Sequence, residues 1–163
     1  MTSKEILLQQ HTACFNETNW FVPLTTALDG LTPEQASWNS GDIVHSIKQI
    51  VNHLIFWNEY HLNRFKEMPT EKITKENAST FNNIEDTLTW ESQIEKIYSI
   101  MNDWKNVLTK AENEKLQSHA LKKTQKSWYA VIANINIHNA FHIGQIIYIR
   151  KLQGSWDSDK GVK

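Results

Sequence analysis

The sequence of 163 residues is short of several residue types, and each shortage excludes a class of protein. Cys14 is its single cysteine, which excludes an internal disulfide framework and a cysteine-rich zinc site. Among 17 basic residues only Arg64 and Arg150 are arginines, and the formal net charge is −1. Nucleic-acid binders carry a basic face and favour the bidentate arginine fork, so we expect no nucleic-acid partner.

Long apolar runs are also missing. No stretch approaches the roughly 18 apolar residues that would cross a bilayer, so we expect no membrane partner. The N-terminal residues, Met-Thr-Ser-Lys-Glu, lack the apolar region of a signal peptide. These absences predict a cytoplasmic protein, and its length predicts a single domain over residues 1–163.

Turn formers are scarce, with five glycines and three prolines, and this favours long helices. Thr89 and Ser127 are suited to cap two of them, and Pro23 is expected to kink the first. Apolar periodicity predicts helices over residues 4–28, 46–67, 90–111 and 128–152. We expect a loop with a short helical turn over 70–86, and a loop with a brief extended piece over 112–125. The fold class is therefore predicted as all-α, a four-helix bundle.

The last predicted helix is apolar on two sides. One face carries Val131, Ile135, His138, His142, Gln145, Ile149 and Leu152. The back carries Ile132, Ile143 and Ile147. A helix with two apolar faces is either central in its bundle or covered by a second subunit, and we favour a homodimer contact.

Seven histidines stand out, and two of them share a helix face. His138 and His142 are four residues apart in the middle of the apolar stripe, so both rings point into the bundle. Buried imidazoles need partners for their nitrogens, and one divalent metal ion would satisfy both rings. The alternative is a pair of core histidines that are hydrogen-bonded to other protein groups.

A third ligand is expected from the helix over residues 46–67. His45, His53 and His61 are eight residues apart, which advances a helix by about 80°, so they cannot share a face. His61 extends the apolar stripe, and His53 lies at its flank, which can still face the core because a bundle helix touches two neighbours. Periodicity leaves both open, and it points His45 away. The remaining two histidines, His11 and His119, lie in polar contexts and are expected to be solvated.

Three segments of the sequence resemble the DinB-like superfamily. The hallmark is a His-Leu pair in the second helix and a His-x-x-x-His-x-Gly-Gln-Ile run in the last one. The matching segments are NHLIFW (52–57), IHNAFHIGQI (137–146, followed by Arg150 and by GSW at 154–156) and the linker-like LTPEQASW (31–38). The resemblance covers most of the chain, and the last-helix motif is its specific part.

This resemblance implies a bundle in up-down-down-up order, often dimeric, with one divalent metal ion, zinc or nickel, on three histidines. The corresponding residues are His53, His138 and His142, with His61 as the fallback for His53. Three imidazoles leave an open coordination position, which is typical of catalytic sites. Related proteins include S-transferases that use bacillithiol, mycothiol or glutathione.

The function implied is that of a metal-dependent enzyme, a thiol S-transferase or a hydrolase in stress response or detoxification. It would act on a small-molecule substrate, with a low-molecular-weight thiol as cosubstrate. The alternative is a non-catalytic metal-binding bundle with a structural or stress-response role. The sequence indicates no catalytic residue besides the three ligands.

Four further residues each have a functional and a structural interpretation, and a fifth, Cys14, has only a structural one. Gln145 would contact a ligand or another helix, and Trp57 would line the pocket or pack in the core. Asn134 would orient a ligand ring or make a packing contact. Arg150 would bind an anion or cap a neighbouring helix, and its face favours the structural role. Cys14 is expected to be a small buried apolar residue.

Overall fold

A computed structural model describes residues 1–41, 45–70, 73, 76–82, 88–121 and 125–162. The α-helices are α1 (Ser3–Phe15), α2 (Leu24–Leu28), α3 (Pro33–Ser37), α4 (Ile47–Phe65), α5 (Trp90–Lys110), α6 (Asn113–Gln117) and α7 (Trp128–Leu152). Two 3₁₀ turns, η1 (Asn77–Thr80) and η2 (Ser158–Lys160), and a hairpin of β1 (His119–Leu121) with β2 (Lys126–Ser127) complete the described elements.

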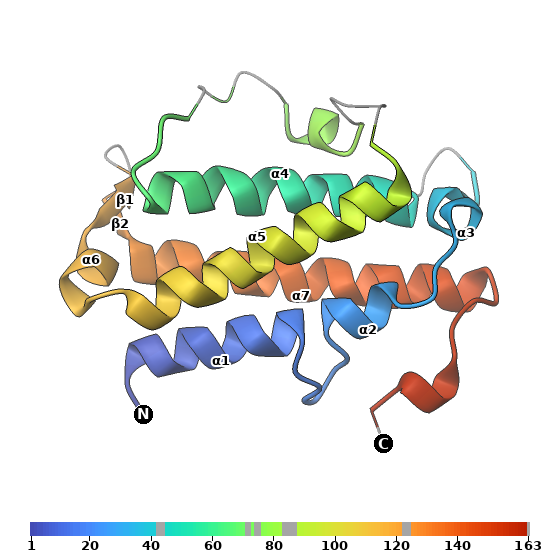
Figure 1. Ribbon diagram of the computed structural model, residues 1–163, viewed down its shortest axis with the longest axis horizontal. Coiled ribbons are helices and arrows are strands. Elements are labelled where there is room, and N and C mark those ends of the chain that lie inside the picture. The colour runs from blue at the N-terminus through green and yellow to red at the C-terminus, as the bar shows by residue number, and fades with distance from the viewer. Residues whose placement is uncertain (42–44, 71–72, 74–75, 83–87, 122–124, 163) are drawn as a thin grey trace.

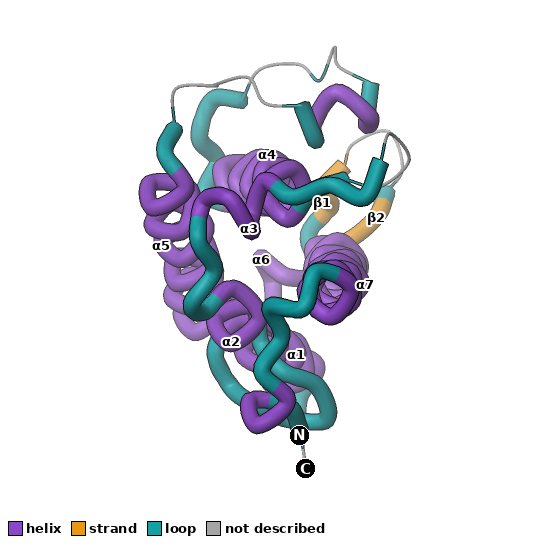
Figure 2. The backbone as a smooth tube through the Cα atoms, turned by 90° about the vertical axis from the view of Figure 1, so that its right-hand side faces the viewer, coloured by secondary structure: helices purple, strands orange, loops and turns teal. Residues whose placement is uncertain are grey.

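Four helices form the bundle. Viewed end-on, α4, α5, α1 and α7 surround one core, and each packs against two neighbours (Figure 2). Along the long axis, α1 and α7 run one way while α4 and α5 run the other (Figure 1). The predicted four-helix bundle and its up-down-down-up order are therefore confirmed.

The sequence placed the starts and ends of the long helices well because the caps are local. Ser46 accepts the Gln49 backbone N–H while the Gln49 side chain accepts the Ser46 N–H, so both orphan donors are satisfied. Thr89 and Ser127 cap α5 and α7 as predicted. Gly154, at φ 75°, ends α7 in the left-handed conformation that glycine adopts without strain.

The prediction of one kinked helix over residues 4–28 is wrong. The helix stops at Phe15, Asn16 is its C-cap, and α2 starts again after Pro23. Proline acts on its own missing N–H and on the residue directly before it, so Pro23 does not cause the stop at Phe15; it is instead the N-cap from which α2 starts.

Two short helices also went unpredicted. α3 lies in the segment that the resemblance identified as a linker, and α6 lies inside the loop expected over residues 112–125. Both are five residues long, which is too short for periodicity to detect. The expected extended piece is confirmed by β1, which pairs with β2 just beyond the expected range. The expected helical turn is confirmed by η1, although residues 71–72, 74–75 and 83–87 lie outside the described part.

Helix α7 is the central element, and both of its predicted apolar faces contribute to the core. Ile132 and Ile143 are buried along with Ile135 and Ile149, since α7 packs against α1, α4 and α2. The assignment of Leu152 to the first of these faces is wrong: it is 52% exposed, at the end of the helix, and continues an exposed stripe with Ile137, Phe141 and Tyr148.

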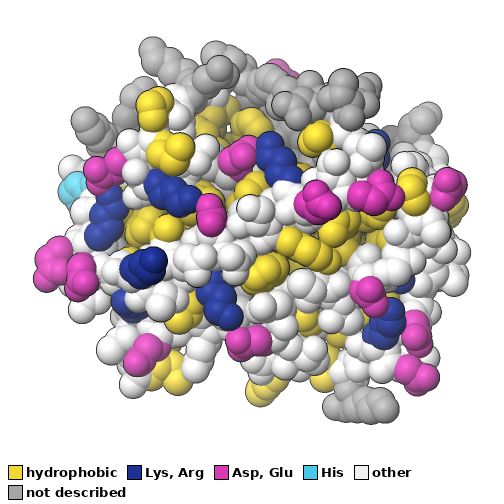
Figure 3. Space-filling model, in the orientation of Figure 1, with side chains coloured by type: hydrophobic (Ala, Val, Ile, Leu, Met, Phe, Trp, Pro, Cys, Tyr) yellow, Lys and Arg dark blue, Asp and Glu magenta, His cyan; other side chains and the backbone are white. Residues whose placement is uncertain are grey.

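The surface crossed by α5 carries charges of both signs close together (Figure 3). Lys66, the C-cap residue after α4, pairs with Asp103 of α5, and Lys96 of α5 pairs with Glu59 of α4. Exposed pairs of this kind contribute little stability, and the buried core dominates. Within the described residues, no helix is long and apolar enough to cross a membrane.

Candidate metal centre

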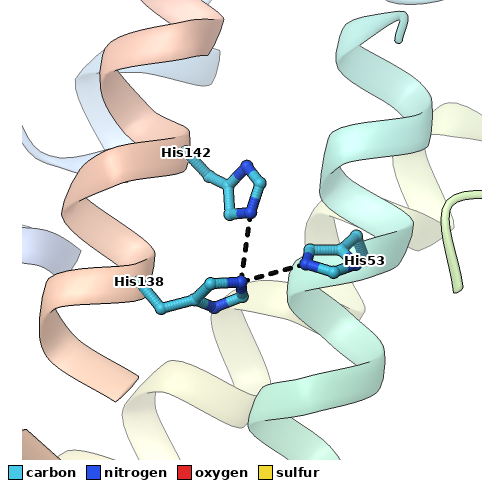
Figure 4. Close-up of side chains that lie close together, drawn as sticks. All are labelled: His53, His138 and His142. Atoms are coloured by element: carbon cyan, nitrogen blue, oxygen red, sulfur yellow. Dashed lines mark hydrogen bonds between the residues drawn. The ribbon is translucent and has the colours of Figure 1, made fainter. Parts of the chain in front are cut away.

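Three histidines from two helices face one point inside the bundle. His53 projects from α4, and His138 and His142 project from α7, one turn apart (Figure 4). Their nearest ring nitrogens all lie within 4.8 Å of one another. His53 and His142 are buried, and His138 is partly exposed. The structure therefore brings together the three histidines to which the resemblance pointed.

The facing atoms are all Nε2. His138 Nε2 lies 2.9 Å from His53 Nε2 and 3.1 Å from His142 Nε2. Convergence of three imidazole nitrogens on a single point is the arrangement that a metal ion needs from its ligands.

The hydrogen bond at His53 Nδ1, the ring nitrogen that faces away from the cluster, determines which nitrogen of this ring carries the proton. Thr80 Oγ1 donates its only proton to the Asn77 carbonyl, 2.6 Å away. It must therefore accept from His53 Nδ1–H, at 2.5 Å. In the neutral ring this leaves a lone pair on His53 Nε2, directed at the other two histidines.

His142 is oriented in the same way by its own helix. Gln145 Oε1 lies 2.6 Å from His142 Nδ1 and can only accept, so Nδ1 carries the proton. The lone pair of His142 Nε2 then faces the centre. Gln145 thus contacts a candidate metal ligand, which is the first of its two interpretations, and such partners hold metal-binding imidazoles in the productive tautomer.

These tautomers make the cluster suited to a cation. The neutral His138 ring has at most one proton on Nε2 and can donate it to only one of its two neighbours. Its contact with the other neighbour then brings two lone pairs to about 3 Å without a proton between them. A divalent metal that takes nitrogen ligands would accept all three lone pairs, so the donor set fits such an ion.

Electrostatics keep the rings neutral. Burial, with contributions from the neighbouring histidines, lowers the pKa of His53 to about 3. Burial likewise lowers the pKa of His138 to about 4. It also lowers the pKa of His142, although the Gln145 bond opposes the effect. Because metals bind the unprotonated ring, the site stays competent well below neutral pH.

An aromatic stack closes one side of the site. Phe81 lies against the His53 ring with centroids 4.0 Å apart and 9° between the planes, and His45 stacks on Phe81 at 3.9 Å. His45 precedes α4 as predicted, is exposed and lies outside the cluster, and it reaches His53 only through the intervening Phe81 ring. Neither Thr80 nor Phe81 was singled out by the sequence, since both belong to the segment between α4 and α5, far from the helical motifs.

Other candidates separate into pocket residues and structural ones. His61 lies outside the cluster and lines a neighbouring pocket with Trp57 and Asn134, so the pocket interpretation of Trp57 is confirmed. Asn134 bonds the Ala130 carbonyl and orients no ligand ring. His119 is exposed as predicted.

Three buried residues have structural contacts only. The prediction that His11 is solvated is wrong: the side chain is 1% exposed and its Nε2 donates to the Met101 carbonyl, 2.8 Å away. Arg150 is buried and donates to the carbonyls of Ala27 and Asp29, which confirms the structural role at the end of α2. Cys14 is buried as expected.

Comparison with known protein families matches residues 23–146 to the DinB superfamily. The chain belongs to the DinB superfamily. The DinB match contains His53, His138 and His142 with Gln145, whereas α1 lies before it. Searches of curated proteins and of solved structures gave no match for this DinB chain. The chemistry of the site is therefore inferred from the chain's own residues and from the family fold.

Proposed function

We propose that this DinB protein is a metal-dependent enzyme whose centre is held by His53, His138 and His142. The single observation that supports the proposal is the convergence of three Nε2 atoms, two of them with lone pairs fixed inward by Thr80 and Gln145. When bound there, a zinc or nickel ion would supply Lewis acidity at its open coordination position, which suits a water or a thiolate ligand.

The proposed reaction class is S-transfer from a low-molecular-weight thiol of the bacillithiol or glutathione type to a small electrophile, or hydrolysis. The chain's own residues would contribute orientation and exclusion of water. Phe81, which is itself buried, covers the His53 ring, with the ring centroids 4.0 Å apart. Such apolar cover lowers the local dielectric and strengthens the interaction of the centre with an anionic ligand.

The test begins with metal analysis of protein prepared without a histidine tag. We expect about one divalent ion per chain, lost in His142→Ala and retained in His119→Ala, whose side chain is exposed. Turnover of monochlorobimane with bacillithiol or glutathione should then require the metal. If the protein binds the metal but turns over no thiol or ester, the enzyme proposal is overturned. The alternative, in which the metal serves folding, is then supported. Chelation should in that case lower the melting temperature strongly.

We further propose that two copies associate through the exposed stripe of α7. Ile137, Phe141, Tyr148 and Leu152 are each more than half exposed, and Gly144 between them has open space around it. An antiparallel crossing at Gly144 would set Phe141 of one copy near Tyr148 of the other, because the stripe is nearly symmetric about the glycine. Light scattering should give a dimer mass, and Tyr148→Glu should give a monomer. A wild-type monomer at micromolar concentration would contradict this assembly.

A further inference from the structure

A pocket of about 450 Å³ opens beside the three-histidine cluster, and His138 lies in its wall. This is within the size range of small-molecule sites. The lining comes from α4 (Trp57, His61), η1 (Asn77), β2 (Lys126) and α7 (Val131, Asn134, Ile135, His138). Since it lies between α4 and α7, one side of the pocket is aromatic and the other is aliphatic.

The aromatic side is formed by two rings of similar orientation. The rings of Trp57 and His61 are 6.0 Å apart, with 24° between their planes. Trp57 Nε1 donates to Asn77 Oδ1 at 3.1 Å, which fixes the indole against η1. Val131 and Ile135 face this surface from successive turns of α7. A slot with aromatic rings on one side and aliphatic side chains on the other fits an elongated apolar group.

The charge in this slot has one sign. Lys126 lines it, no aspartate or glutamate is among its lining residues, and Lys126 forms no ion pair with any residue that the structure describes. Asn77 has its oxygen engaged by Trp57, which leaves its amide N–H groups as donors. The polar complement of the slot is therefore an anion.

The two chemically distinct ends are well separated. His138 follows the first residue of α7 by ten positions, which corresponds to roughly 15 Å along the helix axis. Lys126 lies just before that helix start. A ligand that extends between these two backbone positions is elongated, and we assign its anionic group to the Lys126 end of the slot.

We propose that this slot binds an elongated organic acid, with its anionic end at Lys126 and its apolar middle between Trp57 and Ile135. The opposite end of the ligand reaches His138. The inference rests on the proposed function in one respect only, which is that the ligand end at the histidine cluster is the end that reacts. It assigns Lys126 as the residue that selects acidic substrates.

The test compares 6-phenylhexanoate with its neutral amide by calorimetry on zinc-loaded protein. The acid should bind about fivefold more tightly than the amide, as expected for one partly exposed ion pair. Lys126→Gln should abolish the preference, and Lys126→Arg should keep it. Lys110→Gln, which removes the same charge from an exposed position at the end of α5, should leave it unchanged.

The outcomes that would overturn the assignment of the slot differ from the outcomes that would overturn the proposed metal centre. Equal affinity for acid and amide, or an acid preference that survives Lys126→Gln, would overturn the slot assignment. A preference that disappears on zinc removal but not in Lys126→Gln would show the carboxylate on the metal instead, and this also overturns it. Absence of binding by both probes does the same. If the protein binds no zinc, the proposed function fails, yet the Lys126-dependent preference is still measured in the metal-free protein.

Discussion

Thr80 controls the histidine cluster without contacting its centre. It is 2% exposed, and its hydroxyl holds the Nδ1 proton of His53 while donating to Asn77. Thr80→Val keeps the shape of the side chain and removes the acceptor. In the metal-free variant the His53 proton can move to Nε2, where His138 is a partner at 2.9 Å. Metal binding must then return that proton to a buried Nδ1 without a partner.

The cost of that return sets the expected loss of affinity. A buried donor without a partner costs about 1–3 kcal/mol. At about 1.4 kcal/mol per factor of ten, the zinc affinity of Thr80→Val should fall by about 5-fold to 150-fold. Partners of metal-bound histidines in other sites contribute a comparable factor, about 10-fold to 100-fold.

Zinc affinity is measured by competition with a chromophoric chelator at pH 7.4, after melting curves show that the variants are folded. Thr80→Ser is the matched control, because it keeps the hydroxyl and should bind zinc within about threefold of the wild type. The reasoning is refuted if Thr80→Val binds zinc as tightly as the wild type. It is equally refuted if Thr80→Ser is as weak as Thr80→Val, since the methyl group would then be responsible.

Three further outcomes are expected. Asn58→Leu breaks the two buried hydrogen bonds between the side chains of Asn58 and Asn139, which join α4 to α7. The free energy of unfolding in urea should fall by about 3 kcal/mol, because the buried Asn139 amide is left without its partner. A fall below about 1 kcal/mol would contradict this reasoning. Arg150→Met removes three bonds to backbone carbonyls and should cost about 3 kcal/mol, little of it recovered by Arg150→Lys, because an ammonium lacks the planar fork. Burial lowers the pKa of His11 to about 4 from 6.5, so the unfolded chain alone takes up this proton between those values. The His11 contribution to stability is then complete above about pH 6.5 and falls by roughly 2–3 kcal/mol toward pH 4, in addition to the contributions of the other buried histidines, and His11→Gln should remove this part of the stability–pH curve.

Local signals in the sequence determined the long helices. Thr89, Ser127 and Gly154 act on backbone groups within a turn of themselves, so their effect does not depend on the rest of the fold. Spacing alone placed His138 and His142 on one face of a helix, and Gln145 one turn further. The sequence did not locate the stop of the first helix at Phe15, because this stop lies well before Pro23 and depends on what the following residues pack against.

Only the tertiary structure decided which groups meet. Periodicity allowed both His53 and His61, and the packing of α4 against α7 brings His53 to the cluster and leaves His61 at the pocket. His11 stands in a polar stretch of sequence and is buried, because α1 packs against α5 and presents the Met101 carbonyl to it. Thr80 reaches His53 across 27 positions of chain. Local sequence encodes which face a side chain takes on its own helix, whereas the partner across the interface is set by how the helices pack, and the chemistry of this site depends on that partner.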